Sequence, residues 1–142
     1  MIRIVHILAS GVFWSGFIKD FFSLPRPLSP PLHRITMSGS VALEYGFPST
    51  HSANAVSVAV YCILSLRAPE AADMFAPSTR IALEGLSYFY AISIIFGRLY
   101  CGMHGFIDVI FGSVLGAIIT LIEWYGAPAM ESYLYNGGGR LS

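Results

Sequence analysis

The stretch FGRLYCGMHGFIDVIFG, residues 96–112, places Arg98, His104 and Asp108 between two long apolar segments of the chain. Ionisable side chains are costly inside a bilayer, and they usually face the interior of a helix bundle or a water-filled cavity. The stretch therefore predicts two membrane helices joined by a short turn, with a polar site at the mouth of the second helix.

The composition supports a membrane protein. Of the 142 residues, 55% are hydrophobic and 11% are charged, whereas about a quarter of the residues in a soluble domain are charged. The mean hydropathy is +0.65. The net charge is zero and no basic or acidic run is present, so nothing indicates a nucleic-acid partner. We expect an all-α, polytopic transmembrane helix bundle.

Four apolar segments, about 1–18, 49–66, 81–97 and 105–125, are candidates for membrane spans, which need roughly 17–25 residues. We interpret the first as a span and not a signal peptide, because no convincing small-residue cleavage site follows it. The loop over 19–50 is rich in proline, which excludes a continuous helix. We expect residues 1–128 to form one membrane domain and residues 129–142 to form a flexible tail.

The order of crossings brings distant segments together. If the first span ends on one face of the membrane, the second begins there, the third returns there and the fourth leaves from it. The end of the first span, the start of the second and the turn between the third and fourth must then share one face. That face carries three polar clusters: Lys19 and Arg26; Ser49, Thr50 and His51; and Arg98, His104 and Asp108.

These clusters have the features of an anion site. Lys19, Arg26 and Arg98 converge on one face, and the arginine fork matches the geometry of phosphate oxygens. Ser49 and Thr50 stand where the second span begins, and a helix N-terminus presents free N–H groups and a positive dipole end to an anion. Three nearby positive charges argue against a metal ion, so no metal cofactor is expected.

The two histidines suit acid–base or nucleophilic chemistry. His104 and Asp108 are four residues apart, which would stack them on one face of a helix. The carboxylate can then fix the imidazole tautomer and keep the other ring nitrogen basic. His51, at the start of a different helix, is placed to protonate a leaving oxygen.

Each cluster also has a structural explanation. Lys19 and Arg26 are typical of interfacial anchors, and Ser49 with Thr50 is typical of a plain helix cap. A transporter-like bundle could use Asp108 and the histidines as a proton path, but this would not explain the converging cations. The shared placement of the clusters on one face favours a site for chemistry on an anion.

The three clusters resemble the signature of the type 2 phosphatidic acid phosphatase superfamily, K-x6-R-P, P-S-G-H and S-R-x5-H-x3-D. Here they read KDFFSLPRP (19–27), PSTH (48–51) and GRLYCGMHGFID (97–108). Thr50 replaces a glycine of the broad family, and Gly97 replaces its common serine. The branch that dephosphorylates sphingosine 1-phosphate and long-chain-base phosphates also has P-S-T-H. The residues around the first two motifs, KDFFSLPRPLSPPLHRI and EYGFPSTHSANA, are similar to that branch and most similar to its fungal members.

The resemblance implies a metal-independent phosphatase for sphingoid-base 1-phosphates, located in the endoplasmic reticulum membrane and working through a phosphohistidine. It implies that His104 is the nucleophile, that Asp108 orients it and that His51 is the acid. The residues implied to bind phosphate are Lys19, Arg26, Ser49, Thr50 and Arg98. Most remaining basic residues lie on the opposite face, and this bias predicts a lumen-facing site.

The family core usually has six spans, whereas four are counted in this chain, which fits either a mispredicted start at Met1 or an N-terminally truncated chain. Two other functions therefore stay open. One is a truncated, catalytically inactive membrane protein that binds lipid or partners. The other is a phosphatase for phosphatidic acid or other lipid phosphates.

Overall fold

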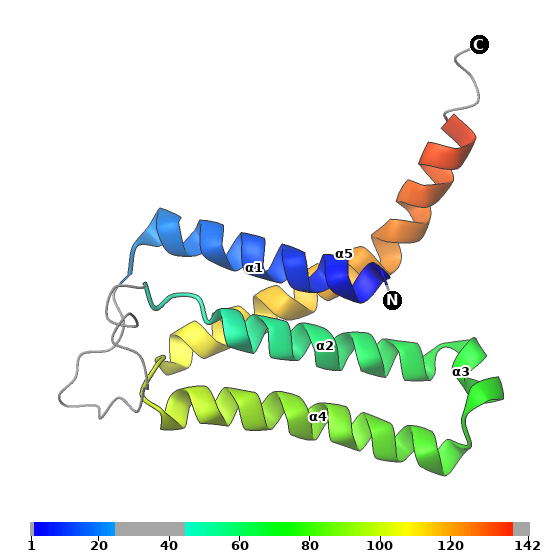
Figure 1. Cartoon of the computed structure of the whole chain (residues 1–142), viewed down its shortest axis with the longest axis horizontal. Helices are drawn as coiled ribbons and strands as arrows, with labels where there is room; N and C mark the ends of the chain where they lie inside the picture. Colours follow the sequence, from blue (N-terminus) through cyan, green and yellow to red (C-terminus); the bar gives the residue numbers. More distant parts are fainter. Residues whose placement is uncertain (1, 25–44, 138–142) are drawn as a thin grey trace.

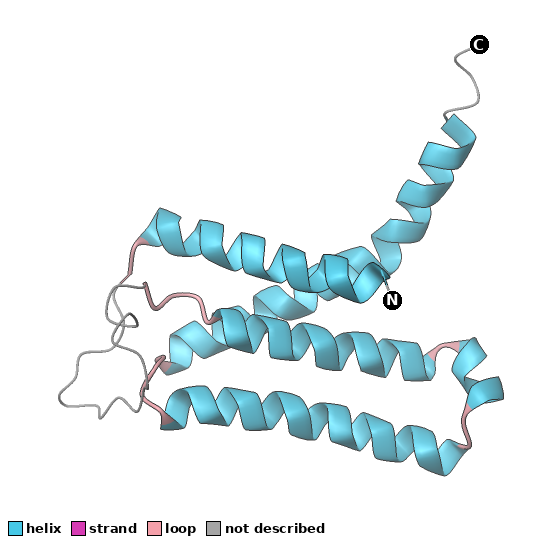
Figure 2. Ribbon diagram, in the orientation of Figure 1, coloured by secondary structure: helices cyan, strands magenta, loops and turns pink. Residues whose placement is uncertain are grey.

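The computed structural model describes residues 2–24 and 45–137 of the chain. Over this part of the chain the secondary structure is entirely helical (Figure 2). The helices are α1 (Ile2–Phe22), α2 (Thr50–Arg67), α3 (Pro69–Met74), α4 (Pro77–Tyr100) and α5 (Phe106–Gly137). The expectation of an all-α bundle is confirmed.

The long helices lie side by side in alternating directions, with α2 packed against α1, α4 and α5 (Figure 1). The end of α1, the start of α2, the end of α4 and the start of α5 gather at one end of the bundle (Figure 1). The short helix α3 lies at the other end, between α2 and α4. The grouping of segments predicted from the order of crossings is therefore confirmed for the described residues.

Within the described residues, three helical segments are long and apolar enough to cross a membrane: Arg3–Phe22, Pro77–Tyr100 and Phe106–Pro128. The expected span over 49–66 is not among them by this measure of length and hydropathy. The corresponding helix α2 nevertheless runs between the same two ends of the bundle as its neighbours, so the fourth span stays a prediction (Figure 1). The buried residues of the corresponding helix α2 are small: Ser52, Ala53, Ala55, Ser57 and Ala59. Small residues let helices approach closely, and they lower the hydropathy of a helix that faces protein more than lipid. At 18 residues, about 27 Å, α2 still runs beside the other helices.

The contact between α2 and α5 depends on two glycines one turn apart. A Cβ atom at Gly112 would collide with the carbonyl oxygen of Ser49, and one at Gly116 would collide with the α2 backbone one turn later. The Ser57 hydroxyl donates to the Gly116 carbonyl at 3.0 Å, and the Thr120 hydroxyl contacts the Ser57 carbonyl at 3.3 Å. The G-x-x-x-G pattern thus holds the start of α5 against the start of α2.

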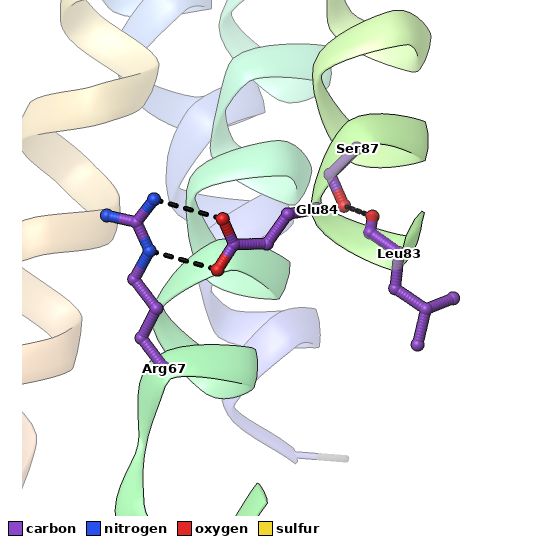
Figure 3. A network of polar contacts seen from close by, with 4 residues as sticks. All are labelled: Arg67, Leu83, Glu84 and Ser87. Carbon is purple, nitrogen blue, oxygen red and sulfur yellow. Dashed lines mark hydrogen bonds and ion pairs between the residues drawn. The ribbon is translucent and has the colours of Figure 1, made fainter. Parts of the chain in front are cut away.

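An exposed ion pair closes the opposite end of the bundle. Arg67, at the end of α2, donates two hydrogen bonds of 3.0 Å to the Glu84 carboxylate of α4 (Figure 3). One turn further along α4, the Ser87 hydroxyl donates to the Leu83 carbonyl at 2.9 Å (Figure 3). The Arg67 side chain is 61% exposed, and exposed pairs of this kind contribute little to stability.

Helix α5 continues beyond the expected end of the fourth span at Tyr125 and reaches Gly137. It changes direction in its second half (Figure 1). Pro128 lies inside the helix, and an internal proline removes a backbone hydrogen bond and kinks a helix. Residues 129–137, which were expected to belong to a flexible tail, are therefore helical.

Candidate active site

His104 lies in the turn that joins α4 to α5, and not on a helix. Gly102 in this turn has a φ of 63°, in the left-handed region, where glycine commonly follows the last residue of a helix. Helix α5 begins only at Phe106. The prediction that His104 and Asp108 share one face of a helix is therefore wrong, because the glycine ends α4 and the chain turns before α5 begins.

The turn nevertheless brings the imidazole and the carboxylate together. His104 is 3% exposed, and its Nδ1 atom lies 3.7 Å from Oδ2 of Asp108. The same Oδ2 atom accepts a hydrogen bond of 2.8 Å from the backbone N–H of Gly105, the residue before α5. This is the carboxylate half of a capping box, and it holds the carboxylate beside Nδ1. A carboxylate facing Nδ1 favours the tautomer in which Nε2 is the basic nitrogen.

Ser49 caps α2 and connects it to α5. Its Oγ atom accepts hydrogen bonds from the backbone N–H of Ser52 at 3.3 Å and from the Ser52 hydroxyl at 2.9 Å. Its own backbone N–H donates to the Asp108 carbonyl at 3.0 Å. The second and third clusters are thus in direct contact. Ser49 is fully buried, and its contacts with described residues are those of a helix cap. Its contact with phosphate stays a prediction.

Ser15 is a residue of the site region that no sequence motif indicated. Its fully buried hydroxyl donates to the Val12 carbonyl at 3.2 Å and shares a hydrogen bond of 3.0 Å with the Thr50 hydroxyl, across the interface between α1 and α2. Lys19 follows Ser15 by one turn on the same face of α1. The bond therefore aligns the last turn of α1, which carries Lys19, with the first turn of α2. The position of Ser15, a polar residue within an apolar segment, is the one feature of the sequence that could have indicated this contact.

Replacing Ser15 with alanine is expected to loosen this alignment. Interhelical hydrogen bonds in membranes contribute about 0.6 kcal/mol on average and up to about 1.7 kcal/mol. Ser15→Ala should therefore lower thermal stability slightly and reduce phosphate release several-fold. Ser87→Ala is the matched control, because it removes a bond within one helix, as Ser15→Ala also does, without the bond between helices. Equal effects of the two substitutions on phosphate release would contradict the positioning role of Ser15.

The other predicted site residues that the structure describes lie on helix ends at the same end of the bundle (Figure 1). Lys19 is half-buried in the last turn of α1, and Arg98 is half-buried in the last turn of α4. His51 is exposed in the first turn of α2. Arg26 lies outside the described residues. The structure thus places two cations and two histidines around the start of α2 and the start of α5.

The family model and the curated relatives that match this chain indicate the same protein family. A family model described as the PAP2 superfamily matches residues 1–130. Dihydrosphingosine 1-phosphate phosphatase C823.11 of Schizosaccharomyces pombe is 44% identical over 121 residues, covering 85% of this chain and 29% of the relative. Dihydrosphingosine 1-phosphate phosphatase YSR3 of Saccharomyces cerevisiae is 38% identical, covering 91% of this chain and 31% of the relative.

A plant protein extends the same pattern. Lipid phosphate phosphatase delta of Arabidopsis thaliana is 36% identical, covering 80% of this chain and 27% of the relative. This chain therefore spans less than a third of the length of each of these relatives. No solved structure matches it.

Proposed function

Since the chain belongs to the PAP2 superfamily, we propose that it carries the active site of a membrane phosphatase for sphingoid-base 1-phosphates. The names of the two yeast relatives support the choice of substrate. The observation that carries the proposal is the buried His104 beside Asp108, at the bundle end where Lys19, His51 and Arg98 also lie.

In the first step, Nε2 of His104 attacks the phosphorus of the lipid phosphate, and the bond from phosphorus to the lipid oxygen breaks. The product on the enzyme is a phosphohistidine. Asp108 holds the Nδ1 side of the ring and stabilises the positive charge that the ring gains. His51 gives its proton to the departing lipid oxygen, which leaves as an alcohol.

In the second step, water attacks the phosphohistidine, and His51 accepts the proton that the water loses. Inorganic phosphate leaves and His104 is restored. Lys19, Arg26 and Arg98 hold the phosphoryl oxygens and stabilise the charge that develops on them in both steps. The first-turn N–H groups of α2 add to this stabilisation because they form the positive end of the helix.

The proposed location is the endoplasmic reticulum membrane, with the site on the lumenal face. Arg3, Arg67 and Arg80 lie near the helix ends at the other end of the bundle from the candidate site. Basic residues are enriched in segments on the cytoplasmic side of a membrane. This bias supports a lumen-facing site.

A broader substrate range is the second candidate function, since the Arabidopsis relative is named a lipid phosphate phosphatase. Phosphate release should be measured with folded protein in detergent, with a metal chelator present, on dihydrosphingosine 1-phosphate and on phosphatidic acid. We expect phosphate release from dihydrosphingosine 1-phosphate and slower release from phosphatidic acid. Equal rates would favour the broader range, and no release from either would refute the catalytic proposal.

The signature serine can be restored at Gly97. Nothing lies within 4 Å of a Cβ atom built at this position, so a serine fits without displacing its neighbours. A hydrogen bond to a charged group is worth about 1.5 kcal/mol or more, so Gly97→Ser should lower the inhibition constant of inorganic phosphate about tenfold or more. Gly97→Ala adds the carbon without the hydroxyl and is the control. Equal inhibition constants in the two variants would contradict a hydroxyl contact to phosphate.

A further inference from the structure

An apolar groove opens beside the candidate active site, between α1 and α5. It has a volume of about 750 Å³. Ile18 and Phe22 of α1 form one wall, and Phe111 and Ile118 of α5 form the other. Asp108 stands at one end and is the only charged residue among the described residues that line the groove. The catalytic steps above use only this end.

The wall formed by α5 follows one face of the helix. Ile107, Phe111, Val114 and Ile118 recur at helical spacing, and all of them line the groove. The twelve residues from Ile107 to Ile118 span about 16 Å along the axis. The hydrocarbon core of a bilayer is about 30 Å thick, so one leaflet is about half of that. The groove therefore runs from the site end of the bundle to about the middle of the membrane.

We propose that this groove holds the single hydrocarbon chain of a sphingoid-base phosphate while its phosphate lies at His104. The inference rests on the proposed function and adds the place and length of the lipid chain. Asp108 lines the groove and also lies 3.7 Å from the Nδ1 atom of His104, so the groove reaches the residue that faces the proposed nucleophile. A lipid whose head group reaches the site keeps its chain in the same leaflet.

Exposure and size support this occupant. Phe111 and Val114 are 57% and 51% exposed, so the described part of the protein leaves them open to lipid. The volume of the groove lies in the range of pockets that hold one small molecule. Aliphatic and aromatic walls contact a hydrocarbon chain without leaving polar groups unsatisfied.

Before it enters the groove, the hydrocarbon chain of the substrate is surrounded by lipid and not by water. Lipid tails are as apolar as the groove walls, so entry into the groove gains little from the hydrophobic effect. Selection must come from close packing of the chain, which also fixes the phosphate relative to His104. A blocked groove should therefore slow the reaction of long-chain substrates and leave short phosphates unaffected.

The test compares Val114→Trp, which fills the groove, with Ile92→Trp, which adds the same ring to an exposed position on α4 outside the groove. The kcat/KM should be measured for dihydrosphingosine 1-phosphate and for phenyl phosphate, which has no chain. Val114→Trp should lower the long-chain value about tenfold or more and leave the phenyl phosphate value within about twofold. Ile92→Trp should change neither. Equal losses on both substrates, or no loss on either, would overturn the proposal.

A second readout does not depend on turnover. A C18 sphingoid-base phosphate with a diazirine at mid-chain should photolabel peptides that cover residues 107–118, and Val114→Trp should suppress this labelling. Labelling confined to α4 would overturn the groove proposal. If the wild-type protein hydrolyses neither substrate, the catalytic proposal fails. The photolabel then still shows where the hydrocarbon chain of the lipid binds.

Discussion

Replacing His104 with alanine should reduce phosphate release from dihydrosphingosine 1-phosphate by at least about 10³-fold, because the substitution removes the atom that attacks phosphorus. The side chain is 1% exposed, and the turn around it is held by backbone bonds and by the left-handed conformation of Gly102. The protein should therefore remain folded. The measurement is kcat with a saturating lipid substrate, together with the thermal unfolding of each variant in detergent.

His6→Ala is the matched control for this prediction. His6 is an exposed histidine of α1 near the opposite end of the bundle, so its loss should change neither kcat nor stability. Activity in His104→Ala above about a tenth of the wild-type value would exclude a nucleophilic role. Loss of activity together with unfolding would be resolved by His104→Asn, which keeps a polar side chain in the turn and should also be inactive.

The second large effect is expected at Gly112. A Cβ atom at this position would collide with the carbonyl oxygen of Ser49. Gly112→Ala should therefore push α5 away from α2 and break the hydrogen bond from the Ser49 N–H to the Asp108 carbonyl. That bond connects the start of α2 to the residue that faces His104. We expect a lower unfolding temperature and at least about a tenfold loss of kcat, since small misplacements of catalytic groups are costly.

Gly126→Ala provides the control on the same helix. Nothing lies within 4 Å of a Cβ atom built at Gly126, so the substitution adds helix propensity without a collision. Alanine is favoured over glycine in a helix by about 1 kcal/mol, and both variants share this gain. Gly126→Ala should thus keep its activity and unfold at the same or a higher temperature. If Gly112→Ala behaved in the same way, the close contact between α2 and α5 would not position the site.

The arrangement of the site was predictable because it follows from the order of crossings. Apolar segments fix how many times the chain reverses, and the reversals decide which helix ends share a face. Lys19, His51, Arg98 and Asp108 were placed together on this basis, and the helix ends that carry them do lie at one end of the bundle (Figure 1). Arg26 lies outside the described residues, so its placement stays a prediction.

Local detail was less predictable, because it depends on contacts between helices. The spacing of His104 and Asp108 fits a helix, but Gly102 ends α4 and places His104 in a turn. The helix α2 has too low a hydropathy to be identified as a membrane span, because the residues that it packs against other helices are small and some are polar. The bond from Ser15 to Thr50 joins residues 35 positions apart, and no motif records it.

The most direct test of the central claim is to trap the phosphoryl group on the protein. Folded protein should be mixed with ³²P-labelled dihydrosphingosine 1-phosphate and quenched in base within one turnover, since phosphohistidine is stable to base and labile to acid. Label is expected on the peptide that contains His104, and no label in His104→Ala. Label on another residue, or turnover by wild-type protein without any label, would contradict the nucleophilic role of His104.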